Sequence, residues 1–155
     1  MKKLKDPEEP LSRFFESARH LGPHLGPILY QLPSGWPVNL ERFEIFLRAL
    51  PRGYRRTVEF REPSWYDERV YDLLRRYKVA LCLHDMHGSA SGKTIVEPCV
   101  YVRFHFGTQK YGGRYDDARL AEWGARSDCG NGSCRISTAP PVRYSRRERA
   151  DRIFA

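Results

Sequence analysis

The chain has 155 residues, of which 41% are hydrophobic and 13% aromatic, so it can form one domain with a core and is not disordered throughout. Its 27 Lys and Arg against 19 Asp and Glu give a formal net charge of +8, which can steer an anionic partner. No run approaches the roughly 18 apolar residues of a membrane span, and Met1 leads into charged residues rather than a signal-peptide core, so we expect a cytoplasmic protein.

The first third of the chain alternates helical and strand patterns. Apolar residues recur with helical spacing from Leu11 up to the Gly22–Pro23 pair, which predicts a helix that ends there. The run 28–32 is apolar and too short for a helix, so it predicts a buried strand. Asn39 is placed to cap a second helix, which ends before Pro51.

The next strand carries charge where a core residue is expected. Val58 and Phe60 face one side of this strand, whereas Glu59 and Arg61 share the other, because strand side chains alternate. Pro63 lacks the N–H that a sheet ladder needs, so we expect the strand to end there. The pattern therefore predicts ionisable groups at the exit of a strand.

Two further strands follow the same plan. Asp67 can cap a helix with apolar residues at helical spacing, and the apolar run 79–83 then ends in His84 and Asp85. The segment 100–105 repeats the design, and Asp116 can cap a last helix. Four alternating strand and helix units favour a parallel sheet covered by helices, with all the polar strand ends at one edge. In parallel α/β folds, ligands bind at that edge.

The polar residues at these strand ends form the predicted site. The candidate catalytic residues are Glu59, His84, Asp85 and His105, and the candidate ligand-binding residues are Gln31, Arg61, Trp65, Arg103 and Tyr111. The ligand-binding residues comprise two arginines that can together bind phosphate or carboxylate, and three residues expected to form the walls of a pocket. For Trp65, the alternative is packing in the core.

Several roles stay open at this point. Glu59 and Arg61 form either a structural ion pair or a general acid or base beside an anion-binding arginine. His84 and Asp85 alternate, so only one faces inward, and the phase with Cys82 favours His84.

The sequence predicts no metal site and leaves the cofactor open. His105 can titrate near neutral pH, and a divalent metal site would draw on Glu59, His105 and one of His84 and Asp85. These ligand types are present, but their spacing is not specific to a metal. The spacing C-x4-C of Cys129 and Cys134 lacks the second pair that a structural zinc needs, and we expect Cys82 and Cys99 to be buried free thiols.

Five motifs together resemble one family. They are GPILYQLP at 26–33, VEFREPSW at 58–65, HD at 84–85, YVRFH at 101–105 and YGGRY at 111–115. In this order they are similar to the domain of unknown function 72 (DUF72) family, the YecE-like TIM barrels. The resemblance implies an α/β fold that is a partial TIM (β/α)8-like barrel, with about four parallel strands alternating with helices. It implies no established activity.

The resemblance also divides the chain. Residues 1–126 correspond to a partial YecE-like TIM-barrel domain, while 127–155 form a basic tail that is poorly ordered or frameshifted. The family begins with three further strand units and ends with a helix and strand that this tail does not match. We therefore expect a gene misread at both ends, with an internal Met taken as the start and a frameshift after about Arg126.

The function that the sequence favours is a fragment of a TIM-barrel enzyme that binds a small polar or anionic ligand at the strand ends. Whether the chain is catalytic is left open. One alternative is a non-catalytic binding protein that needs a partner chain, since open sheet edges favour self-association. The other is a nucleic-acid binder, which is disfavoured because the last 27 residues carry half of the excess positive charge and no nucleic-acid-binding motif occurs.

Overall fold

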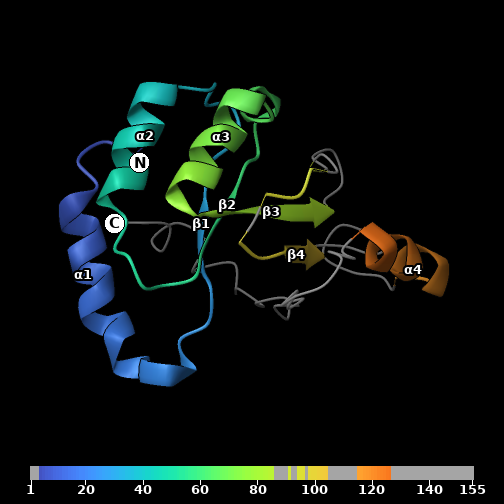
Figure 1. Ribbon diagram of the computed structural model, residues 1–155, viewed down its shortest axis with the longest axis horizontal. Helices are drawn as coiled ribbons and strands as arrows, with labels where there is room; N and C mark the ends of the chain where they lie inside the picture. Colours follow the sequence, from blue (N-terminus) through green and yellow to red (C-terminus); the bar gives the residue numbers. More distant parts are fainter. Residues whose placement is uncertain (1–3, 86–90, 92–93, 97, 105–114, 127–155) are drawn as a thin grey trace, which may run out of the picture.

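The computed structural model describes residues 4–85, 91, 94–96, 98–104 and 115–126. The expected tail and both of its cysteines, together with His105 and Tyr111, lie outside these ranges. The elements are α1 (Glu8–Ala18), a 3-10 helix (Arg19–His24), β1 (Ile28–Gln31), α2 (Leu40–Ala49), β2 (Arg56–Glu59), a 3-10 turn (Pro63–Trp65), α3 (Glu68–Tyr77), β3 (Ala80–Asp85), β4 (Tyr101–Phe104) and α4 (Asp117–Arg126), as labelled in Figure 1.

The four strands form one parallel sheet in the order β1-β2-β3-β4. This confirms the predicted α/β fold, in which strands alternate with helices. The register pairs Gln31 with Glu59, and His84 with Arg103. Since all strands run in the same direction, their carboxyl ends meet at one edge of the sheet.

Two helix starts form as their cap residues predict. The Asn39 side chain accepts a hydrogen bond from the backbone N–H of Arg42 at 2.9 Å, and α2 begins at the next residue. Asp67 accepts from the N–H of Arg69 at 2.9 Å at the start of α3. Both side chains satisfy N–H groups that have no partner inside the helix.

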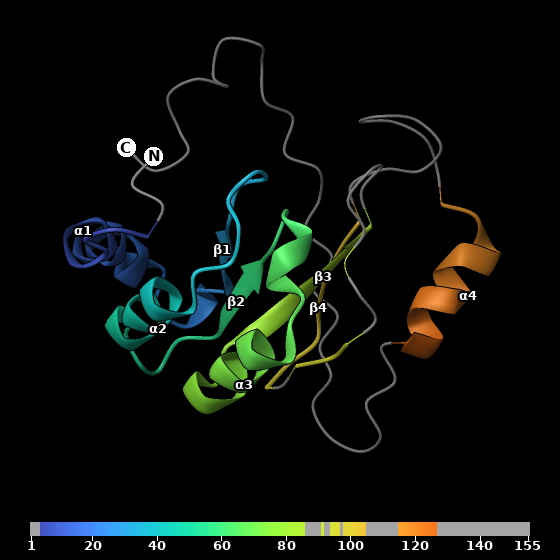
Figure 2. The same cartoon turned by 90° about the horizontal axis from the view of Figure 1, so that it is seen from above.

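The helices cover one face of the sheet, and the core lies between. Ring contacts join the two layers: Tyr30 of β1 packs on Phe46 of α2, and Phe104 of β4 packs on Trp123 of α4. Figure 2 shows α1, α2 and α3 side by side, in the same order across the sheet as the strands. We call the opposite face of the sheet the inner face. None of the helices among the described residues is long and apolar enough to cross a membrane.

Two boundaries differ from the sequence-based expectation. The ladder of β2 ends at Glu59, and Pro63 instead opens the 3-10 turn, so the chain leaves the sheet before the proline is reached. The first helix begins at Glu8 and gives way to a 3-10 helix after Ala18, whereas Gly22 takes a positive φ of 50° and turns the chain. Glycine adopts this backbone conformation without steric penalty.

Candidate functional site

A cluster of polar side chains lies on the inner face at the carboxyl ends of the strands. Alternation places Gln31, Glu59 and Arg103 on this face, because Tyr30, Phe60 and Phe104 pack into the helix layer or its aromatic cluster on the other. Gln31 and Glu59 end their strands and are register partners. Three separate strands therefore bring their polar residues to one place.

Glu59 is the centre of the cluster. Its side chain is 0% exposed, and each carboxylate oxygen accepts from a different arginine. Arg61 Nε donates to Oε1, while Arg103 Nη1 donates to Oε2 at 2.5 Å. Since β3 separates β2 from β4, the Arg103 side chain crosses the inner face of β3 to reach this carboxylate.

Gln31 links the two arginines a second time. Its Oε1 accepts from Arg61 Nη2 at 3.2 Å and from Arg103 Nη1 at 3.4 Å. Among the described side chains, the cluster thus contains two guanidinium groups, one carboxylate and one amide, whose formal charges sum to +1.

This geometry favours a positioning role for Glu59. A fully buried carboxylate bonded to two guanidinium groups is held in its charged form, and both oxygens are already engaged. Such a group is poorly placed to take or give a proton. The structural ion pair, one of the two roles considered from the sequence, therefore fits the geometry better than general acid or base catalysis.

Cys82 lies on the inner face of β3, the strand that the Arg103 side chain crosses. Its Sγ lies 3.7 Å from Glu59 Oε2, a contact that the sequence analysis did not anticipate. Burial raises the pKa of the Cys82 thiol well above its usual range, and the nearby Glu59 carboxylate acts in the same direction. The thiol is therefore neutral at physiological pH. The available signal was the spacing, since Cys82 precedes His84 by two residues and shares its face.

His84 and Asp85 separate as strand alternation requires. His84 is fully buried and lies on the inner face, next to Arg103 in the register. Asp85 is half-buried and is the register partner of Phe104, which packs on α4. The backbone carbonyl of Asp85 accepts from the Tyr115 hydroxyl at 3.5 Å.

Trp65 lies in the aromatic core and away from the polar cluster. Its side chain is 0% exposed, stacks on Phe60 with ring centroids 5.2 Å apart, and packs against Phe43. The indole N–H donates to the Trp36 carbonyl at 2.8 Å, so its one polar group is also satisfied. A residue with no exposed surface is not a pocket wall, so core packing, the alternative considered for Trp65, describes its position.

The described residues offer no metal site. Among them, no group of three or more His, Cys, Asp or Glu is arranged to hold a metal ion. His105 and Tyr111 lie outside the described residues, so the metal set that would include His105 stays a prediction.

The fold and the cluster define the class of protein. A parallel sheet with helices on one face is the arrangement of an α/β protein, and the polar side chains converge at its carboxyl edge. A sequence model of the family described as "Protein of unknown function DUF72" matches residues 1–136. This match extends beyond Arg126, the residue at which the domain was expected to end. The chain belongs to the DUF72 family, as the sequence motifs indicated.

Solved structures show the same fold. A DUF72 family protein from Thermotoga maritima MSB8 is similar with a TM-score of 0.66 and 21% identity, over 86% of this chain and 58% of that one. A DUF72 family protein from Enterococcus faecalis V583 gives a TM-score of 0.64 and 15% identity, over 79% and 56%. The chain therefore spans little more than half the length of these proteins. No curated protein matches the chain.

Proposed function

We propose that this chain is part of a TIM-barrel-type protein that binds a small anionic or polar ligand through Arg61, Arg103 and Gln31. The observation that carries the proposal is the convergence of two guanidinium groups, one from the segment after β2 and one from β4, on one buried carboxylate. Glu59 holds the two guanidinium groups side by side at the strand ends, where one bound anion can interact with both of them.

The exposure of the cluster supports a ligand on its outer side. Glu59 is 0% exposed, whereas the side chains of Arg61 and Arg103 are 15% and 25% exposed. The carboxylate is thus beneath the guanidinium groups, which retain solvent-facing surface. A planar guanidinium binds carboxylate or phosphate through two parallel hydrogen bonds, so the ligand class is a small oxyanion or a polar molecule bearing one.

In this proposal, Glu59 positions the two arginines and does not react. His84 shares the inner face with the cluster but is also 0% exposed, so it lies on the buried side of the cluster, as Glu59 does. In this proposal the ligand therefore interacts with Arg61, Arg103 and Gln31. We expect a variant of either arginine to weaken binding of an anion, and a His84 variant that folds to leave this binding in place.

Calorimetric titration with inorganic phosphate and with a small dicarboxylate tests the binding step. We expect Arg61→Ala and Arg103→Ala each to weaken binding by about tenfold or more, since a hydrogen bond to a charged group contributes roughly 1.5–3 kcal/mol. Arg69→Ala is the matched control, because Arg69 pairs with Asp67 on an exposed helix start. It also removes one positive charge but leaves the cluster unchanged.

Two outcomes would overturn the proposal. One is that the unaltered chain binds neither probe. The other is that Arg69→Ala weakens binding as much as the cluster variants, which would mean a diffuse charge effect. Arg103→Lys keeps the charge but loses the planar fork, so affinity that survives in this variant would contradict bidentate recognition.

A further inference from the structure

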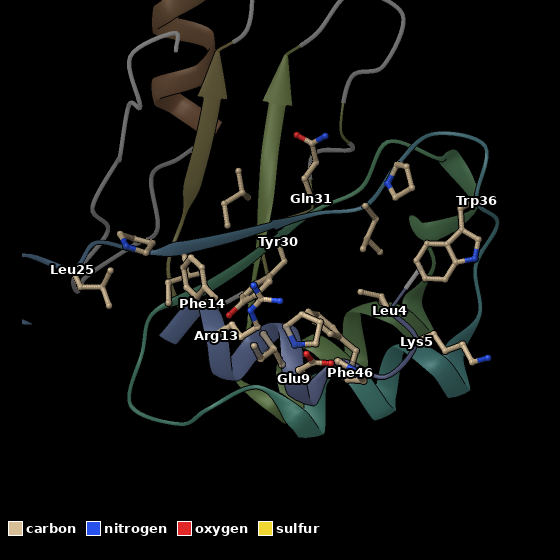
Figure 3. Close-up of a pocket in the computed structure, with 18 of the residues that line it drawn as sticks. Leu4, Lys5, Glu9, Arg13, Phe14, Leu25, Tyr30, Gln31, Trp36 and Phe46 are labelled. Carbon is tan, nitrogen blue, oxygen red and sulfur yellow. The ribbon is translucent and has the colours of Figure 1, made fainter. Parts of the chain in front are cut away.

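A groove of about 560 Å³ runs along β1, on the side of this strand away from β2. Its walls come from α1, from all four residues of β1 and from Phe46 of α2. Figure 3 shows Phe14, Tyr30 and Phe46 on one side of the strand and Gln31 pointing to the other. Residues of both faces of β1 line the groove, so the edge of the strand itself is part of the groove.

The backbone of β1 gives this edge its hydrogen-bonding groups. The N–H groups of Ile28 and Leu32 donate to Arg55 and Glu59, so both point toward β2. Successive backbone N–H groups of a strand point in opposite directions. Those of Leu29 and Gln31 therefore point into the groove, together with their carbonyl groups. An edge of this kind pairs readily with another strand.

We propose that a second copy of this chain docks on this groove and pairs its β4 with the free edge of β1. In the described part of the sheet, β1 and β4 are the two outermost strands, and they run in the same direction. A two-fold rotation about an axis along the strands places β1 of each copy beside β4 of the other. Both contacts are then equivalent, as in a closed symmetric dimer.

The strand count favours a second copy over other occupants. Two copies of the four strands in the described residues supply eight strands, the number that closes a (β/α)8 barrel with its helices outside. Closure pairs both free edges at once, whereas a small apolar ligand in the groove leaves the Leu29 and Gln31 groups without a backbone partner. It also covers Phe14, whose side chain is 39% exposed at the groove. This inference does not depend on the anion site, because it concerns the strand edge alone.

Light scattering after size exclusion tests the assembly. We expect the 155-residue chain to have twice the 18.1 kDa mass of one copy and to dissociate on dilution. Phe14→Arg places a charge in the groove, which we expect to weaken the dimer at least about tenfold because burying an unpaired charge is unfavourable. Ile45→Arg is the matched control: Ile45 is 49% exposed on α2 and does not line the groove, so this variant stays dimeric.

Hydrogen exchange measured at single residues tests the strand pairing. The amides of Leu29 and Gln31 become protected in the dimer together with amides of β4, and they lose this protection on dilution or in Phe14→Arg. A mass of 18.1 kDa at every concentration overturns the proposal. So does a dimer in which Leu29 and Gln31 exchange freely, or one that protects β1 and not β4, since the latter indicates pairing between two β1 strands.

Discussion

The two ends of β2 use buried charge in opposite ways. At its start, Arg56 is 8% exposed and donates to the Tyr77 carbonyl at 2.9 Å, at the carboxyl end of α3. At its end, Glu59 binds side chains from the segment after β2 and from β4. Arg56 stabilises the carboxyl end of a helix, whereas Glu59 binds side chains from two separate segments of the chain.

Hydrogen bonding separates the two ends further. Near the start of β2, the Tyr30 hydroxyl and Arg56 Nε are buried and have no hydrogen-bond partner in the part of the chain that the structure describes. At the end, both Glu59 oxygens and the Gln31 oxygen are engaged by arginines. A cluster whose acceptor oxygens are all engaged holds its members in fixed positions, which suits a binding site. The polar groups near the start of β2 are less completely hydrogen-bonded, and we expect them to contribute to the stability of the fold and not to binding.

Removing the central carboxylate is the strongest test of this contrast. Glu59→Gln keeps the shape but leaves two guanidinium groups facing each other without a counter-charge. We expect a loss of about 3 kcal/mol in the free energy of unfolding, at the low end of the range for a broken buried pair because the arginines keep some solvent contact. Urea unfolding measures it.

The double variant Glu59→Gln with Arg103→Gln sharpens the result. It removes one guanidinium along with the carboxylate, so we expect it to be more stable than the sum of the two single losses predicts. Strict additivity of the two losses would show that Glu59 and Arg103 do not act together, which would contradict the cluster.

The start of β2 gives a smaller effect on stability and none on the site. Arg56→Met keeps the apolar part of the side chain but loses the charge at the end of α3. We expect the free energy of unfolding to fall by about 2 kcal/mol, the size of a hydrogen bond from a charged group. Phosphate binding stays unchanged, as calorimetry can check. Weaker phosphate binding in this variant would contradict the separation of the two ends.

The sequence predicts features that depend on neighbouring residues. Asn39 and Asp67 cap helices because their short side chains reach N–H groups within the next three residues. Glu59 and Arg61 share a face because strand side chains alternate. The convergence of polar residues at one edge follows from the repeated strand and helix units. Such units give parallel strands, which the structure has.

The rest depends on packing that no local pattern encodes. The bond from Arg103 to Glu59 requires the strand order and a small residue, Cys82, on the strand between them. Trp65 follows the strand that carries Glu59, yet the 3-10 turn directs its ring into the aromatic core. The role of Arg56 was not anticipated either, because Tyr77 lies 21 residues away along the chain.

The smallest expected effect comes from Tyr30, whose buried hydroxyl lies near the charge of Arg56. Burial raises the pKa of Tyr30 from 10.0 to about 12, while Arg56 opposes the shift. Between these two values the unfolded chain loses the phenol proton and the folded chain keeps it, so stability is lost as the pH rises through this window. Tyr30→Phe removes this loss.

We expect the variant to be within about 1 kcal/mol of the original chain at pH 7, because the hydroxyl it lacks has no hydrogen-bond partner among the described residues. Above pH 10, it should unfold at higher urea concentration than the original chain. Equal pH dependence of the two chains would show that the hydroxyl is solvated, and the contrast between the two ends of β2 would then be weaker than described.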